Sequence, residues 1–108
     1  MTTTFVASGV SSGNVTVTNG DELEVQSGGL AVATNVQSGG ILQTDFGGVA
    51  SGTIVANSGT DTVFGIDSGA TIQSGGTMLV SSGGVASNTT ATANGATFRF
   101  QSVSEVKL

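Results

Sequence analysis

Residues 38–59 read SGGILQTDFGGVASGTIVANSG and decide the fold, because they contain one full unit of a repeat that runs through the 108-residue chain. In this unit, Ser-Gly and Gly-Gly pairs separate short runs that are rich in β-branched residues. Such an arrangement predicts brief strands joined by tight turns, since glycine adopts positive φ without a steric penalty. Turn clusters of the same kind recur along the sequence roughly every seven to eleven residues.

Every second turn marks the repeat unit, and the anchors are Gly20, Gly39, Gly59, Gly75 and Gly95. Successive anchors lie about 19 residues apart, with one shortened copy between Gly59 and Gly75. Residues three and five positions after each anchor are expected to point inward: Leu23 and Val25, Leu42 and Thr44, Thr62 and Phe64, Met78 and Val80, Phe98 and Phe100. Residues five and three positions before each anchor form a second inward column: Val15 and Val17, Thr34 and Val36, Ile54 and Ala56, Ala70 and Ile72, Thr90 and Thr92. A third column follows the intermediate turns: Leu30-Ala31, Val49-Ala50 and Val85-Ala86.

This repeat favours an all-β solenoid. Glycine and β-branched residues occur in every window, and no segment between turns is long enough for a stable helix. A β-propeller blade needs about 40 residues, and a β-sandwich is built from longer strands of unrelated sequence. A coil of about 19 residues with two or three short strands fits a parallel β-helix, in which each coil stacks on the last. We therefore predict a right-handed parallel β-helix (solenoid) of about five coils, the hand following the preference of parallel crossovers.

Three segments are expected along the chain: an N-terminal cap at 1–11, the β-helix repeats at 12–95, and a C-terminal cap strand and tail at 96–108. The two ends of a solenoid expose unpaired strand edges, which can template pairing with another chain. Incomplete caps would therefore allow head-to-tail stacking.

The composition argues against several classes of function. The chain has no histidine and no cysteine, so it lacks the commonest general base and metal ligand and any thiolate chemistry. Its net charge is −5, with Arg99 and Lys107 as the two basic residues, so nucleic acid is not an expected partner. No apolar run approaches the ~20 residues of a membrane helix, and no secretory signal peptide is recognisable. We expect no enzyme activity, no cofactor, no metal site and no membrane insertion.

Carboxylates are the side chains that come nearest to a catalytic or cation-binding pattern. Glu22 and Glu24 are expected on one outward strand face, as a weak cation site, a catalytic pair or, preferentially, a solvated surface that discourages aggregation. Three aspartates could act as polysaccharide-cleaving carboxylates, which work in pairs beside a groove: Asp45, Asp61 and Asp67. Groove walls come from long loops, whereas every turn here is short. These aspartates are therefore expected to be solubilising side chains near turns.

Hydroxyl and aromatic side chains have two interpretations each. Outward serines could accept O-glycans, although turn chemistry alone explains most of them: Ser38, Ser51, Ser58, Ser74, Ser82 and Ser87. Four phenylalanines are expected to pack in the core or a cap rather than to form a platform for sugar stacking: Phe46, Phe64, Phe98 and Phe100. The Gly-Gly pairs lack the third glycine and the aspartate of calcium-binding nonapeptide repeats, so they do not predict a calcium site of that kind.

Two segments resemble the repeats of AIDA-type autotransporter adhesins and the related antigen 43 group of self-associating adhesins. They are Val36-Gln37-Ser38-Gly39-Gly40 with the following run 47–59 (GGVASGTIVANSG), and 74–90 (SGGTMLVSSGGVASNTT). The resemblance extends from about Ser12 to Gly95. It implies a right-handed β-helical passenger segment, exposed at a bacterial surface or secreted, that adheres or autoaggregates through side-by-side contacts. It also implies that serine or threonine hydroxyls can carry heptose, as in some members.

The expected function is therefore that of a non-enzymatic β-helical repeat module that mediates adhesion or self-association outside the cell or at the bacterial cell surface. The expected partner is a second copy of the chain, stacked laterally or end to end, with glycans or a host surface as further possibilities. The alternative is a passive stalk or an O-glycosylation acceptor scaffold, as the N-terminal repeat block of a larger secreted bacterial protein. A polysaccharide-acting enzyme is a third hypothesis.

Overall fold

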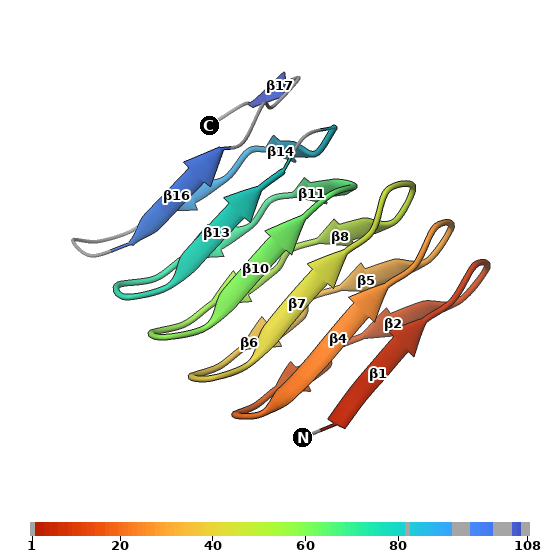
Figure 1. Cartoon of the computed structure of the whole chain (residues 1–108), viewed down its shortest axis with the longest axis horizontal. Helices are drawn as coiled ribbons and strands as arrows, with labels where there is room; N and C mark the ends of the chain where they lie inside the picture. Colours follow the sequence, from red (N-terminus) through yellow and green to blue (C-terminus); the bar gives the residue numbers. More distant parts are fainter. Residues whose placement is uncertain (1, 82, 92–95, 101–104, 107–108) are drawn as a thin grey trace.

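The computed structural model describes residues 2–81, 83–91, 96–100 and 105–106, and its regular elements there are all β-strands in three parallel sheets (Figure 1). Sheet A contains β1 (Thr2–Val6), β4 (Asp21–Val25), β7 (Ile41–Thr44), β10 (Thr60–Val63), β13 (Thr77–Val80) and β16 (Thr97–Phe100). Sheet B contains β2 (Ser11–Gly13), β5 (Leu30–Val32), β8 (Val49–Ser51), β11 (Ile66–Ser68), β14 (Val85–Ser87) and β17 (Glu105–Val106). Sheet C contains β3 (Thr16–Val17), β6 (Asn35–Val36), β9 (Ile54–Val55), β12 (Thr71–Ile72) and β15 (Thr90–Ala91).

One strand from each sheet makes one coil, and the coils stack in sequence order from the N-terminal to the C-terminal end (Figure 1). We number them coil 1 (β1–β3), coil 2 (β4–β6), coil 3 (β7–β9), coil 4 (β10–β12) and coil 5 (β13–β15), with β16 and β17 continuing the stack. Thr60 pairs with Ile41 of the preceding coil and with Thr77 of the following coil, and the step to Thr77 is the shorter of the two. The predicted parallel β-helix of about five coils, with one shortened copy, is therefore confirmed.

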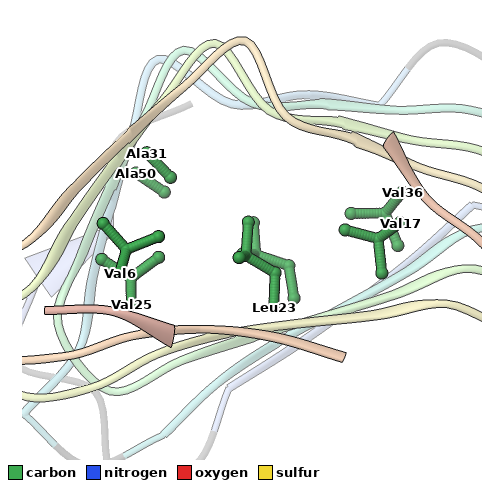
Figure 2. Packing of buried hydrophobic residues seen from close by; sticks show 8 residues of the cluster. Val6, Val17, Leu23, Val25, Ala31, Val36 and Ala50 are labelled. Carbon is green, nitrogen blue, oxygen red and sulfur yellow. The ribbon is translucent and has the colours of Figure 1, made fainter. Parts of the chain in front are cut away.

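The interior is filled by columns of side chains from equivalent positions of successive coils. Figure 2 shows Val6 lying over Val25, Ala31 lying over Ala50, and Leu23 extending into the space between the sheets. All five side chains are buried. Because one coil alone cannot bury these faces, the fold depends on the contact of each coil with its neighbours.

The Gly-Gly pairs serve two different physical needs. The first glycine adopts positive φ, as Gly47 does at 87°, a conformation that L side chains rarely adopt. The second glycine packs against the preceding coil. A Cβ on Gly48 would lie 2.7 Å from the carbonyl oxygen of Val25, and a Cβ on Gly40 would lie 2.5 Å from that of Val17. The pair therefore gives both a sharp turn and the close approach that coil stacking requires.

The inward column predicted in sheet A is confirmed in coils 2, 3 and 5, where the buried residues are Leu23, Val25, Leu42, Thr44, Met78 and Val80. In coil 4 the prediction of Thr62 and Phe64 is wrong, because Asp61 and Val63 are the buried residues. Asp61 pairs in register with Leu42 and Met78. Phe98 and Phe100 of β16 pair with Met78 and Val80, as the predicted column requires.

This displacement by one residue has its cause at Ser58. Ser58 has a φ of 65° and occupies the left-handed turn position that Gly39 and Gly75 occupy in the neighbouring turns. The true anchor of the unit is therefore Ser58, and Gly59 follows it as the close-packed second residue of the pair.

The column predicted in and beside sheet C is confirmed at its buried members Val17, Thr34, Val36, Ala70 and Ile72. Val15 is partly buried against the core, and Thr92 lies outside the described residues. Three predictions are wrong by one position: Thr53 is buried in place of Ile54, Val55 in place of Ala56, and Thr89 in place of Thr90. The first two errors follow from Ser58. The third arises because the step from Thr77 to its partner Thr97 is longer than the step from Ile41 to Thr60, so this unit contains an extra residue.

The third column is confirmed at Ala31, Ala50 and Ala86, which are buried. In coil 4 the equivalent position is Asp67, which pairs with Ala50 on one side and Ala86 on the other. Within the described part of the chain, no helix is long and apolar enough to cross a membrane.

Candidate functional site

Strand β4 carries acidic residues on its outer side. Glu22 and Glu24 are half-buried at the surface, whereas Leu23 and Val25 point inward and are buried, as predicted. A hydrogen bond with Asp45 raises the pKa of Glu24, and slight burial and the charges of Asp45 and Glu22 add to this effect. Over the described residues, no group of three or more histidine, cysteine, aspartate or glutamate side chains could hold a metal ion.

Asp45 lies in the turn that leads from β7 to β8, half-buried at the outer surface. The Nε2 atom of Gln43 donates a hydrogen bond of 2.9 Å to Oδ1 of Asp45. The expectation of a polar side chain near a turn fits Asp45. It is wrong for Asp61 and Asp67, because both are fully buried inside the solenoid.

Asp61 and Asp67 therefore form a carboxyl pair in the interior of coil 4. Asp61 lies on β10 in the sheet A wall, and Asp67 lies on β11 in the sheet B wall. A turn of two residues, Phe64 and Gly65, joins these two strands. Neither carboxyl group has a hydrogen-bond partner when both are taken as ionised. Two carboxyl groups can bond to one another only when one of them carries a proton, since an ionised carboxylate is an acceptor alone.

The electrostatics of this pair favour its protonated form. Burial raises the pKa of Asp61 well above the ordinary value, and the charge of Asp67 and a hydrogen bond with it act in the same direction. Burial also raises the pKa of Asp67, while the neighbouring Asp61 carboxyl group and Thr53 hydroxyl partly offset the effect. Asp61 is thus the favoured proton donor and Asp67 the acceptor.

This burial bears on the hypothesis of a polysaccharide-cleaving enzyme. No pocket is found on the described part of the chain, and the two buried carboxyl groups, Asp61 and Asp67, lie where a saccharide cannot contact them. Asp45 is on the outside and separate from them. The structure thus does not bring the three aspartates into one site.

The outward serines fall into two groups. Ser38, Ser58 and Ser74 are exposed in turns that lead from sheet C to sheet A. Ser51 and Ser87 are half-buried on sheet B, and both pair in register with Ser68, which makes a ladder of three hydroxyl-bearing residues. Ser82 lies outside the described residues.

Two phenylalanines contradict the prediction of core or cap packing. Phe46 is 78% exposed and Phe64 is 36% exposed. They lie in the turns from sheet A to sheet B of coils 3 and 4, which are neighbours in the stack. We call this pair the aromatic corner. The side chains of Phe98 and Phe100 lie outside the described residues.

Sequence reasoning missed both the carboxyl pair and the aromatic corner. The sequence held a signal for the carboxyl pair. The link from β10 to β11 has two residues, whereas each of the neighbouring links has four residues and includes a Gly-Gly pair. The signal for the corner was weaker. Phe46 stands at the turn position that serine occupies in coil 2, at Ser27, which indicates a solvent-facing residue.

Comparison with known proteins reveals a likeness in structure. No protein-family model matches the chain, and no curated protein matches it in sequence. Among solved structures, the chain is similar to the crystal structure of a hyper-glycosylated TibA fragment whose glycosylation is catalysed by TibC. The TM-score is 0.88 and the sequence identity 31%, over 98% of this chain. The chain spans 39% of the length of that fragment.

Proposed function

We propose that this chain is a non-enzymatic, adhesin-like β-helical module that acts at or beyond the bacterial cell surface by associating with further copies of itself. Its repeats resemble those of AIDA-type adhesins, and its structure is similar to that of the hyper-glycosylated TibA fragment. The observation that carries the proposal is the aromatic corner, where Phe46 is 78% exposed. Exposed aromatic side chains are enriched at contact surfaces between proteins.

The surface beside the aromatic corner suits contacts that are individually weak. Ile66, directly after the turn of Phe64, is 44% exposed on the outer face of β11. The serine ladder on sheet B adds hydroxyl groups, each of which contributes about 0.5–1.5 kcal/mol net when it forms a hydrogen bond. Because one such contact is weak, association relies on several contacts acting together along the repeated coils.

The proposal is tested by sedimentation velocity at increasing protein concentration. We expect the wild type to form oligomers and Phe46→Ser to shift the distribution toward the monomer. This substitution introduces the residue that coil 2 already has at Ser27, so the fold should be retained. The matched control is Ile54→Thr, which changes a residue that is 39% exposed on sheet C, where Thr71 is its register neighbour. A wild-type protein that stays monomeric at the highest concentration contradicts self-association.

A second candidate function is that of an acceptor scaffold for O-linked glycans. The specific observation in its favour is the similar TibA fragment, which is hyper-glycosylated. In this chain, Ser38 and Ser74 are exposed at equivalent turn positions of coils 2 and 4. Regular, exposed hydroxyls on a rigid solenoid would present acceptor groups at fixed intervals.

Intact-mass measurement of the protein from its natural host tests the second candidate. We expect increments the size of a hexose or heptose, and fewer of them in Ser38→Ala/Ser74→Ala. The matched control is Thr18→Ala, which changes an exposed hydroxyl that donates to Oδ2 of Asp21 at 2.8 Å. An unmodified mass contradicts the acceptor scaffold and leaves self-association to be judged by sedimentation.

A further inference from the structure

The two buried aspartates occupy positions that are apolar in the coils on either side. Asp61 and Asp67 are both fully buried. Their register neighbours are Leu42 and Met78 for Asp61, and Ala50 and Ala86 for Asp67. In coil 4 a pair of carboxyl groups thus takes the place of a leucine facing an alanine. The loss of volume at the leucine position is offset by the gain at the alanine position, so the replacement keeps the interior filled.

Among the described residues, no other titratable group faces this pair. The strands next to β10 contribute a leucine and a methionine, and those next to β11 contribute two alanines. The remaining wall of coil 4 contributes Ala70 and Ile72, both buried. The one polar group that contributes to the electrostatics of the pair is the Thr53 hydroxyl, near Asp67. Because no basic side chain contributes to the electrostatics of the pair, full ionisation would leave two negative charges facing one another in an apolar interior.

We propose that Asp61 and Asp67 share a proton inside coil 4, and that this proton makes coil 4 the pH-sensitive segment of the solenoid. In the folded state the protonated carboxyl of Asp61 donates its O–H to the carboxylate of Asp67, which also faces the Thr53 hydroxyl. Loss of the proton to solvent breaks this hydrogen bond and leaves two carboxylates in contact, which opens the coil. This is a property of the core, so it is independent of whether the outer faces mediate adhesion.

The direction of the pH dependence follows from the raised pKa values. The pKa of both aspartates lies above the ordinary value of 3.8 in the folded chain, so between that value and the raised pKa values the folded state holds more protons than the unfolded state. The contribution of the pair to the free energy of unfolding is therefore fully present below about pH 4, and it is lost as the pH rises toward and through the folded-state pKa values. For each proton that is held, the folding equilibrium constant falls up to about tenfold per pH unit across this window.

The test is urea unfolding followed by circular dichroism at a series of pH values, with the wild type and Asp61→Asn/Asp67→Asn. The asparagine pair keeps the size and polarity of the site and has no proton to lose. We expect the wild type to lose stability from about pH 4 upward relative to the asparagine variant. The matched control is Glu22→Gln/Glu24→Gln, which removes two carboxyl groups from the outer face. Because the pKa of Glu24 is also raised, this variant should lose a small part of the wild-type decline and keep the larger part, which comes from the buried pair. Parallel pH profiles for the wild type and the asparagine variant overturn the proposal.

A bound cation is the competing way to neutralise two buried carboxylates, and the same proteins distinguish it. Calcium chloride or EDTA should leave the unfolding midpoint of the wild type unchanged if a proton is shared. The proposal is overturned in favour of a metal if calcium raises the unfolding midpoint of the wild type, EDTA lowers it, and neither changes the midpoint of the asparagine variant.

A direct measurement covers the case in which the asparagine variant does not fold. The Cγ carbons of ¹³C-labelled aspartate in the wild type report the protonation state of each carboxyl group by NMR. We expect at least one of the Asp61 and Asp67 signals to titrate well above the ordinary value of 3.8. Titration of both signals at or below that value overturns the shared proton.

Discussion

Coil 3 and coil 4 are neighbours with the same three-strand plan, yet their interiors differ in chemistry. In coil 3, Leu42 of sheet A and Ala50 of sheet B fill the centre. In coil 4, Asp61 and Asp67 fill the same two positions. The turn between the walls also differs, with four residues between β7 and β8 and two between β10 and β11. The sequence of coil 4 thus departs from the repeat in its core and its turn together.

This difference shows that register in a solenoid is maintained by the backbone, even where the core residues change character. The ladder Leu42–Asp61–Met78 continues through coil 4 without a break. Backbone hydrogen bonds between coils run on both sides of it, such as the one of 2.8 Å from Phe64 N to Thr44 O. A polar pair can therefore occupy one layer, provided that its two members satisfy one another.

The largest effect is expected when coil 3 receives a third buried carboxyl group. Leu42→Asp removes a buried leucine and places an acid next to Asp61, its register neighbour, whose carboxyl group is already paired with that of Asp67. We expect a loss of about 4 kcal/mol in the free energy of unfolding at pH 7, measured by urea titration. The loss should be smaller below about pH 4, where the carboxyl group is protonated in both states.

Leu42→Asn is the control for this prediction, because it has a similar size and cannot ionise. Its cost should be the same at both pH values. If Leu42→Asp costs less than about 1 kcal/mol at pH 7, coil 3 does not seal its interior from water as the structure indicates.

The reverse exchange should make coil 4 more stable. Asp61→Leu/Asp67→Ala gives coil 4 the core pair of coil 3, and replacing a buried ionisable pair by packed apolar residues is worth about 1–4 kcal/mol. The gain should be seen at pH 7 by urea unfolding. Asp67→Ala alone should be less stable than the double variant, because it leaves Asp61 buried without its acceptor. A double variant that is less stable than the wild type at pH 7 would mean that the pair contributes more than an apolar core does.

The turns before β8 and β11 both end in a glycine that packs on the preceding coil. Gly48→Ala would place a Cβ 2.7 Å from the carbonyl oxygen of Val25. We expect this clash with backbone to cost about 1–3 kcal/mol in thermal or urea unfolding. Gly13→Ala is the matched control, since a Cβ there meets nothing within 4 Å. Equal stabilities of the two variants would contradict the role of close packing.

Most of the fold could be predicted from the sequence, because Gly-Gly turns with the same two physical needs recur from coil 2 to coil 5. Strand type, coil length and the inward columns of coil 2 follow directly from that spacing. The error begins at Gly59, since the pattern marks the left-handed position by a glycine, whereas Ser58 occupies it. One residue of displacement in a strand exchanges its two faces. The sequence pattern therefore places Asp61 at the surface, which is wrong.

The sites could be predicted less well than the fold. The outward face of Glu22 and Glu24 follows from alternation alone and is confirmed. The core or cap packing predicted for Phe46 follows from its hydrophobicity and is wrong, because alternation does not extend into a turn and gives no direction there. To predict the carboxyl pair, one must know which residues meet across the interior, and this depends on the length of the turn between β10 and β11.

The smallest effect is expected at the turn between coil 3 and coil 4, where Ser58 holds a φ of 65°. The left-handed conformation costs an L residue roughly 1–2 kcal/mol, whereas glycine adopts it freely but loses more entropy on folding. Ser58→Gly should therefore raise the free energy of unfolding by about 0.5–1 kcal/mol, measured by urea titration. The reverse exchange, Gly39→Ser, should lower it, because Gly39 has a φ of 79° in the preceding equivalent turn. If Ser58→Gly is destabilising, the hydrogen bond of 3.2 Å from its Oγ to Oδ1 of Asn57 outweighs the backbone strain, and serine at this turn is a stabilising residue in its own right.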